Sequence, residues 1–385
     1  MSNDISLTGL TELVYATRDQ VAREATGFIQ GVTINSSDVG VSIGGTVNSF
    51  RSTAPTLNTS YTPAMTVPAA SDITTATDTM TIGQVANVQI PLKGELVRQL
   101  NNTAGAAAFQ SLIAQGIRTI VNAIEARIGV VAKNAISRAV GTAGTTPFAS
   151  NADLVATMRQ ILQDNGCPLS DGELSLVINS AAGAKMRNLS NLYKVNEAGS
   201  DNLLRRGELL NLHNFSIRES AGVAAHTKGT GASYLVDLVA GYVAGDRSIH
   251  IDTGTGTVVA GDLLAFESDT NVYGVFSGCP GDGDQDIVLN YPGLRAALAN
   301  NKTVTVGNAY TGNVGFHRSA IELVMRPPAM PEGGDAGQHE VIYDDQTGLV
   351  FDLGLYKGRG MNMLELTCMY EAKAWKPEFI AGLLG

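Results

Sequence analysis

Apolar side chains recur every three or four positions over residues 105–140, and this period predicts a single long helix. The expected buried face comprises Phe109, Leu112, Ile113, Ile117, Ile120, Val121, Ile124, Ile128, Val131 and Ala135. The expected polar face comprises Ser111, Gln115, Arg118, Asn122, Glu125 and Lys133. No proline interrupts the stretch, and Gly141 and Gly144 end it. The stripe follows no sustained heptad, so we expect a rod of roughly 54 Å that braces other elements rather than a coiled coil.

Before the rod, residues 7–30 have a second amphipathic helical pattern. Composition then shifts to Thr, Ser, Val and Gly, and two alternating runs, residues 40–47 and 80–90, predict strands. Between these runs, residues 54–71 contain few large apolar side chains and cannot bury a core of their own. We therefore expect this stretch to be either a mobile loop or an arm that lies on a neighbouring subunit.

After the rod, the pattern is typical of ordinary α/β packing. A capping box at residues 150–153 predicts the start of a helix that ends at Gly166. Residues 173–179 and 215–219 predict strands, and residues 181–189 predict a short helix between them.

Residues 227–313 alternate short β-prone runs with Gly/Asp turns, which is the spacing of a small β-barrel or sandwich inserted into the larger unit. Beyond it, residues 316–325 predict a helix or a strand, and residues 326–331 a proline-rich extended stretch. A hairpin is expected over residues 340–355, and a final strand over residues 362–374.

Composition adds a constraint on the surface. Charged residues make up 16% of the chain, and hydrophobic residues make up 44%, whereas charged residues are roughly a quarter of ordinary soluble proteins. This balance fits a well-buried α+β protein, and it equally fits a chain whose surface is covered by other subunits. With a net charge of −10 and no basic run, tight binding to nucleic acid is not expected.

Neither end of the chain nor its cysteines point to a membrane or an oxidising compartment. No stretch approaches 18 apolar residues, so we expect no membrane span. The N-terminus, residues 1–4, does not begin like a secretory signal. The three widely spaced cysteines, Cys167, Cys279 and Cys368, predict reduced thiols with no disulfide framework.

Candidate chemistry is sparse. The histidines, which have no helical metal-ligand spacing, are expected to be exposed or satisfied inside the fold; they are His213, His226, His250, His317 and His339. Asp282, Asp284 and Asp286 open like a calcium loop, but Ile287 and Gly293 replace the glycine and glutamate that such a loop needs. There is also no phosphate loop and no nucleophile elbow. We therefore predict no catalytic residues, no metal and no cofactor.

Four stretches, in their order along the chain, suggest a family. They are residues 21–29, the strand–turn–strand pattern at 259–275, the run GFHRSAIELVMRP at 315–327, and residues 363–379. Together with the order of elements, they resemble phage major capsid proteins of the HK97 type, in the branch with an inserted β domain typified by the P22 coat protein. The resemblance covers nearly the whole chain, and the third stretch is its most specific part.

The resemblance implies an α+β, HK97-like capsid fold with an inserted small β-barrel domain. Its parts would be an N-arm (1–35), an E-loop (36–92), a P-domain with the spine helix (93–144), an A-domain (145–226), the inserted β domain (227–313), an A-domain return (314–337), and the P-domain sheet with the C-terminus (338–385). It implies a structural function: pentamers and hexamers of this chain, assembled in the host cytoplasm, form the icosahedral shell of a virion around double-stranded DNA. The implied partners are other copies, a separate scaffolding protein, a portal and, as an option, a decoration protein.

Two further expectations follow. Shells of this family that cross-link covalently use a lysine in the E-loop, whereas residues 35–92 contain none, so we predict a non-covalent lattice. We predict subunit contacts at Arg18, Arg23, Glu24, Arg51, Tyr61, Arg118, Glu125, Asp246, Asp282 and Asp284. An α/β enzyme with a β insert stays as the alternative, and a surface-layer or fimbrial subunit would call for a signal peptide.

Overall fold

The computed structural model describes residues 27–52, 75–93, 103–189, 211–343 and 348–385, apart from positions 38 and 336, together with Pro63 and Met65. The fold is mixed α and β, and strands predominate. In the described part of the chain, no helix has the length and apolar character needed to cross a bilayer. Most of the predicted helix at 7–30 and of the predicted arm at 54–71 lies outside the described residues.

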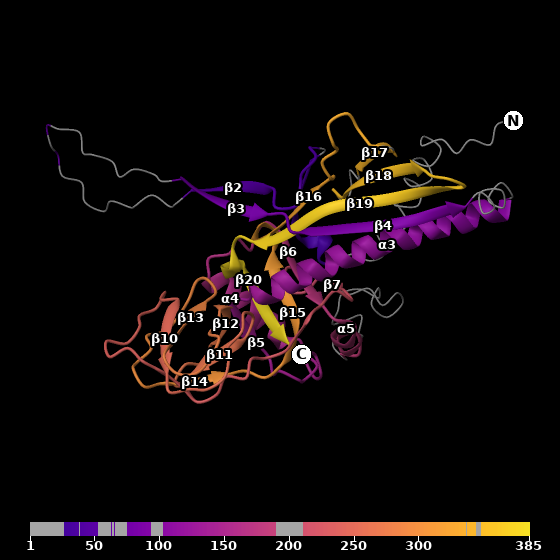
Figure 1. Ribbon diagram of the computed structural model, residues 1–385. Coiled ribbons are helices and arrows are strands. Elements are labelled where there is room, and N and C mark those ends of the chain that lie inside the picture. The colour runs from indigo at the N-terminus through magenta and orange to yellow at the C-terminus, as the bar shows by residue number, and fades with distance from the viewer. Residues whose placement is uncertain are drawn as a thin grey trace.

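A long twisted sheet forms one side of the molecule (Figure 1). Its strands are β1 (Thr33–Ser36), β4 (Gln84–Lys93), β16 (Ile321–Arg326), β17 (Gly337–Tyr343), β18 (Val350–Lys357) and β19 (Met361–Ala374). The 14-residue strand β19 pairs with β4 along one side and with β18 and then β16 along the other. β17 pairs with β18, and β1 lies parallel to β16. The predicted hairpin at 340–355 and the predicted strand at 362–374 are thereby confirmed.

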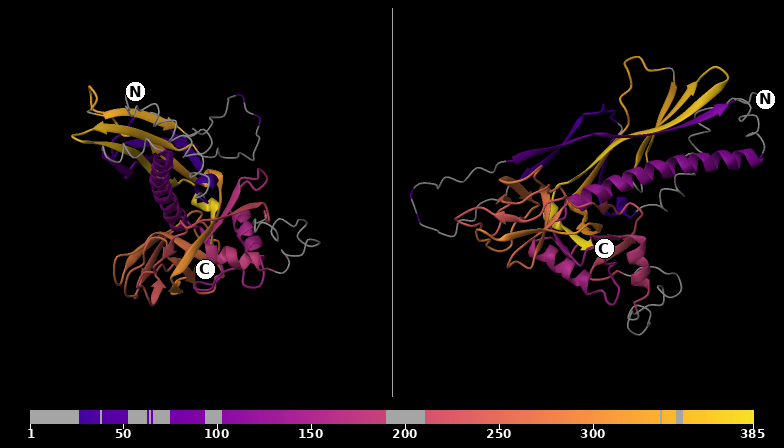
Figure 2. Two further views of the ribbon diagram at one scale, coloured as in Figure 1. Left: turned by 90° about the vertical axis from the view of Figure 1, so that its right-hand side faces the viewer. Right: turned by 60° about the horizontal axis from the view of Figure 1, so that its bottom comes forward.

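The predicted rod is helix α3 (Thr103–Asn134), which runs beneath this sheet (Figure 2). Ile113, Ile117 and Ile124 are buried and share one hydrophobic core with β19 residues such as Leu364 and Leu366. A helix of 32 residues is about 48 Å long. Its predicted apolar face is largely confirmed, although the side chain of Leu112 is 44% exposed.

The predicted end of this helix, near residue 140, is wrong. The chain leaves the helix after Asn134 and forms strand β5 (Arg138–Val140), which is paired on both sides. Ala135, Ile136, Ala139 and Val140 extend the apolar residues past the end of the helix, and periodicity alone does not separate a short strand from one more helical turn.

A second sheet lies below the helix, with helices α4 (Asp153–Asp164) and α5 (Ser180–Arg187) beside it. Its strands, in order, are β5, β20 (Ile380–Leu384), β15 (Tyr310–His317), β6 (Leu174–Ile178) and β7 (Phe215–Glu219). The predictions for α4, α5, β6 and β7 are confirmed within two residues. The predicted capping box is not formed, because the residue before α4 is Ala152 and no side chain caps that helix.

Residues 234–306 form six short strands that close into a ring. They are β9 (Tyr234–Val236), β10 (Ser248–Asp252), β11 (Leu263–Phe266), β12 (Val272–Ser277), β13 (Gln285–Leu289) and β14 (Thr303–Val306). Successive antiparallel pairings run β11–β14–β9–β10–β13–β12 and return to β11. The ring is a small barrel with its own core, which includes Tyr234, Ile249 and Leu264. The β-prone runs that predict strands in this region are residues 258–266, 272–276, 286–289 and 303–306, and they overlap β11, β12, β13 and β14. The pattern does not predict β9 or β10.

The barrel is tied to the rest of the chain at several points. The chain enters after β8 (Ala225–His226) and returns through β15, where His226 lies opposite Tyr310. β12 pairs with β5, and Asn290 Nδ2 donates to the carbonyl oxygens of Asn134 and Ile136, at 2.9 and 2.8 Å. Asn290 therefore caps the carboxyl end of α3 from the barrel.

A two-stranded ribbon, β2 (Thr46–Ser52) with β3 (Thr75–Thr81), completes the described elements. The predicted strand at 40–47 is wrong over most of its length, because Ile43 and Gly44 form a turn and pairing in β2 begins only at Thr46. The predicted strand at 80–90 is divided by a break at residues 82–83 into β3 and β4. Likewise, residues 316–325 belong to two strands, β15 and β16, that are joined by a 3-10 helix at Arg318–Ala320.

Candidate assembly surfaces

The β2–β3 ribbon projects from the body of the molecule (Figure 1). Among the described strands, these two pair only with each other. At the base of the ribbon, Met80 and Ile82 pack against Val324, while Thr77 and Thr79 further along β3 are exposed. A two-stranded ribbon is marginally stable in water unless another surface covers it. The ribbon is therefore a candidate contact with another chain.

Glu125, predicted on the polar face of the rod and at a subunit contact, lies instead in the interior and is 2% exposed. Its carboxylate accepts hydrogen bonds from the backbone N–H groups of Gly27, Phe28 and Ile29, at 2.7, 2.6 and 3.0 Å, and from Ser220 Oγ at 2.6 Å. The prediction of an exposed Glu125 is wrong, because the segment at 27–29 covers this position of the helix. The carboxylate fastens that segment to α3 within the subunit.

Glycine is required where the segment at 27–29 and helix α3 each meet the chain at residues 220–222. A Cβ atom on Gly27 would lie 2.6 Å from the Cβ atom of Ser220, and one on Gly129 would lie 2.1 Å from the carbonyl oxygen of Gly222. Contacts this short do not occur between real atoms, so larger residues would force the backbone apart.

The other predicted contact residues are dispersed. Arg18, Arg23, Glu24 and Tyr61 lie outside the described residues, and Arg51 lies in β2 opposite Ala76. Arg118 is half-buried on α3.

The three acidic residues predicted on the barrel do not form one site. Asp246 precedes β10 and accepts the N–H of Val243 at 2.8 Å. Asp282 and Asp284 are exposed in the β12–β13 loop, beyond the other end of β10, and Asp282 accepts the N–H of Gly256 at 2.6 Å. Their contact with other subunits stays a prediction.

Sequence reasoning missed an exposed group on the barrel. Phe276 is 60% and Tyr291 is 44% exposed, and the Arg247 guanidinium lies 3.5 Å from the Tyr291 ring centre and 5.9 Å from that of Phe276. Phe276 follows the alternation of its strand, because Tyr273 and Val275 face the core of the barrel and Phe276 therefore faces outward. The local pattern carries this signal. Exposed aromatic and arginine side chains of this kind are enriched at protein interfaces.

One cluster has metal-ligand composition: Asp171, Glu173 and His317, whose ligand atoms lie within 4.8 Å of one another. The backbone N–H of Ser319 donates to His317 Nδ1 at 3.2 Å, and Nε2 lies 2.8 Å from Asp171 Oδ2. A neutral imidazole has one N–H, so Nε2 must donate to Asp171 and has no lone pair for a metal. This hydrogen bond holds the pKa of the Asp171 carboxyl below its usual range. The cluster is an internal clamp.

The other described histidines also fit the sequence prediction. His226, His250 and His339 each pair with an aspartate, and His213 is exposed. All three cysteines are buried and unpaired by disulfides, as predicted.

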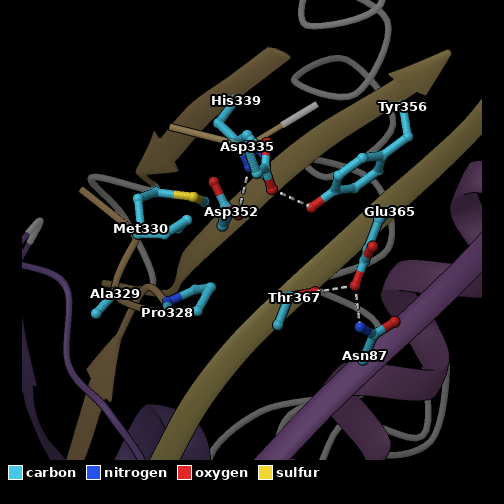
Figure 3. Close-up of a pocket in the computed structure, with 11 residues that line it drawn as sticks. Asn87, Pro328, Ala329, Met330, Asp335, His339, Asp352, Tyr356, Glu365 and Thr367 are labelled. Carbon is cyan, nitrogen blue, oxygen red and sulfur yellow. Dashed lines mark hydrogen bonds and ion pairs between the residues drawn. The ribbon is translucent and has the colours of Figure 1, made fainter. Parts of the chain in front are cut away.

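A groove of about 280 Å³ lies on the face of the long sheet opposite α3 (Figure 3). Its lining residues are Asn87, Pro328, Ala329, Met330, Pro331, Asp335, His339, Asp352, Tyr356, Glu365 and Thr367. The side is fixed by alternation in β19, since Glu365 and Thr367 alternate with residues that face the helix.

No protein-family model and no curated protein matches this chain. Solved structures do match it. A chain from Mycobacterium phage Che8 has 15% identity and a TM-score of 0.45, covering 88% of this chain and 84% of that one. A chain of the cyanophage P-SCSP1u capsid has 14% identity and a TM-score of 0.47, covering 94% and 88%. A virus-like particle from Pyrococcus furiosus has 7% identity and a TM-score of 0.43, covering 97% and 98%. Because these TM-scores lie below 0.5, we base the functional conclusion on the geometry of this chain.

Proposed function

We propose that this chain is a major capsid protein of the HK97 type, which assembles as pentamers and hexamers into an icosahedral shell around phage double-stranded DNA. The observation that carries the proposal is the projecting β2–β3 ribbon, whose two strands pair with each other and with no other described strand. A ribbon of this kind gains its missing burial by lying on an adjacent subunit.

The rest of the molecule supports a role as a rigid tile. A helix of 32 residues and a sheet built on a 14-residue strand share one core, and together they make an elongated beam. Such a beam keeps its shape while forces pass between neighbours, because packed cores resist deformation. In this proposal the beam is the P-domain, the second sheet is the A-domain, the barrel is the inserted domain and the ribbon is part of the E-loop.

The charge balance supports a container role. The chain carries a net charge of −10, so its surface repels phosphates over distances of about 10 Å at ordinary salt. A shell with this charge would enclose DNA without binding it tightly. Exposed groups such as Phe276 and Tyr291 on the barrel would then contact other subunits or a decoration protein.

Assembly would proceed in the host cytoplasm with a separate scaffolding protein and a portal, and the finished shell would be held by non-covalent contacts. The absence of lysine from residues 35–92 supports the non-covalent part, because it removes the amine on which E-loop cross-linking depends.

The test is expression of the chain with and without its neighbouring scaffold gene, followed by gel filtration and negative-stain microscopy. We expect capsomers or closed particles of megadalton mass, which give a single band of monomer mass in SDS. A stable monomer that forms no particles with or without the scaffold would contradict the capsid function. Particles that give ladders in SDS would contradict only the non-covalent lattice.

A further inference from the structure

His339 lies between two carboxylates that come from different elements. Its Nδ1 atom lies 3.0 Å from Asp352 Oδ2 in β18, and its Nε2 atom lies 3.0 Å from Asp335 Oδ1 in the segment before β17. Ionised carboxylates only accept hydrogen bonds, so both ring nitrogens must donate and the cluster must hold one proton more than a neutral imidazole supplies. Figure 3 shows the two aspartates on either side of the ring.

The segment that His339 holds has few other attachments. Residues 327–335 leave β16 and pass along the groove. At the near end, Val41 donates its N–H to Pro327 and accepts the N–H of Ala329, at 3.1 and 3.0 Å. At the far end, residues 331–335 are exposed, so no apolar burial fastens them. Just before β17 begins at Gly337, the Asp335 carboxylate ties this end of the segment to the sheet, because it lies beside His339 Nε2 and accepts the hydroxyl of Tyr356 at 3.0 Å and the N–H of Gly337 at 2.7 Å.

We propose that His339 is a proton-operated latch. With two protons on its ring it fastens the segment at 327–335 across the groove, and loss of one proton to solvent loosens the Asp335 end, which then keeps only its bonds to Tyr356 and to the N–H of Gly337.

The charges around the ring determine which bond is lost. The groups that face it are Asp335 from the segment, Asp352 and Tyr356 from β18, and Glu365 from β19, and no lysine or arginine is among the described residues that line the groove. The side chain of Asp352 is 6% exposed, whereas that of Asp335 is 26% exposed. An unpaired buried carboxylate is far more costly than a hydrated one, so the remaining N–H stays with Asp352. The Nε2 lone pair then faces the Asp335 carboxylate and repels it.

The direction of the pH effect follows from the same contacts. Burial alone would lower the pKa of His339, but the hydrogen bonds and charges of Asp352 and Asp335 outweigh burial and raise the pKa above its usual value. The pKa of His339 is higher in the folded chain than in the unfolded chain, where it is about 6.5. The contribution of His339 to folding stability is therefore complete below about pH 6.5 and is lost as the pH rises through the folded pKa. Tyr356, which donates to Asp335 at 3.0 Å, keeps its proton throughout, since burial and Asp335 raise its pKa to about 12. The latch is closed in acid and open in weak base.

The test is hydrogen exchange of the full-length chain between about pH 6 and about pH 9, corrected for the intrinsic rate of each amide. In the wild-type chain we expect the protection of amides in residues 329–335 to fall about tenfold across this range, the equivalent of one charged hydrogen bond. The variant His339→Gln should show low protection at every pH. The control His250→Gln removes a histidine that also pairs with an aspartate, Asp286, but lies on the barrel, so the segment should behave as in the wild type.

Protection of these amides that is independent of pH in the wild type, or a pH dependence that survives in His339→Gln, would overturn the latch. A second measurement does not depend on the variant folding. In a ¹H–¹⁵N spectrum of the wild-type imidazole, the form with two protons should persist above the ordinary histidine pKa of about 6.5, and titration of the ring below that pH would equally overturn the proposal.

Discussion

At the residue scale, the informative positions are polar groups that the structure buries. Helical periodicity placed Glu125 on the exposed face of the rod. A local pattern cannot detect its burial, because the partners of this carboxylate lie 95–98 positions away in sequence. Phe276 is a different case, because alternation with Tyr273 and Val275 already places it on the outward side of β12. The cysteines and histidines were predicted correctly, because unsuitable spacing alone was enough to argue against disulfides and helical metal sites.

Replacing Glu125 with alanine should leave three backbone N–H groups and the Ser220 hydroxyl without an acceptor. We expect the free energy of unfolding to fall by about 3 kcal/mol, since each buried unpaired donor is costly. Urea titration followed by circular dichroism measures this change. Asn122→Ala, at an exposed position of the same helix, should change stability by less than about 0.5 kcal/mol. Equal effects of the two substitutions would contradict the role assigned to Glu125.

The cysteines should be unreactive in the folded chain. Burial raises the pKa of the Cys167 and Cys368 thiols to about 12, so almost no thiolate exists near neutral pH. Cys279 is 2% exposed. A thiol reagent such as DTNB at about pH 8 should label fewer than one of the three cysteines per native chain, and all three in guanidinium. Rapid labelling of the native chain would show that the core opens readily.

At the element scale, the sequence predicts best those elements whose burial is periodic and local. α3, β6, β7 and β19 fall in this class, because each has one buried side or is buried throughout. The end of α3 was mispredicted because apolar residues such as Ile136 and Ala139 continue past it into β5. The strands β9 and β10 were missed although β11 and β14 are about as short and were predicted, and although Ile249 and Ile251 of β10 alternate with polar neighbours.

A substitution at Gly129 tests how closely α3 packs against the chain at Gly222. In an open helix, Gly→Ala stabilises by about 1 kcal/mol. Here the new methyl group would lie 2.1 Å from the carbonyl oxygen of Gly222, so we expect Gly129→Ala to destabilise the fold by about 1–3 kcal/mol in urea or thermal unfolding.

Gly116→Ala is the matched control in the same helix. Its methyl group would meet side chains alone, Val88 at 3.2 Å and Ile90 and Leu366 at 3.7 Å, and should leave stability within about 1 kcal/mol of the wild type. A stabilising Gly129→Ala would mean that the packing at Gly222 is looser than the structure indicates.

At the scale of the whole molecule, composition left two readings open: a well-buried protein, or one covered by other subunits. The projecting ribbon favours the second reading, and sequence alone could not establish it, because the direction of a ribbon depends on where its base is packed. The division into parts implied by the family resemblance stays a prediction, and it cuts across the sheets, since β16 belongs to the long sheet and β20 to the second one.

The ribbon can be removed to separate folding from assembly. In a variant that joins Ser49 to Asp78, which face each other across the ribbon, through an Asn-Gly turn, the body should keep its circular dichroism and unfold at nearly the same temperature. We expect this variant to form no closed particles in negative stain, because the intersubunit contact is gone. Particles as abundant as those of the wild type would show that the ribbon does not hold neighbours together.

The barrel is joined to the body by two chain crossings side by side, by the β12–β5 pairing and by the side chain of Asn290 on the end of α3. A module held by a single crossing would swivel, but one held at several points must turn together with its base. Torque applied to the barrel is therefore delivered to the axis of the long helix, and a twist of that helix reorients the barrel by the same route.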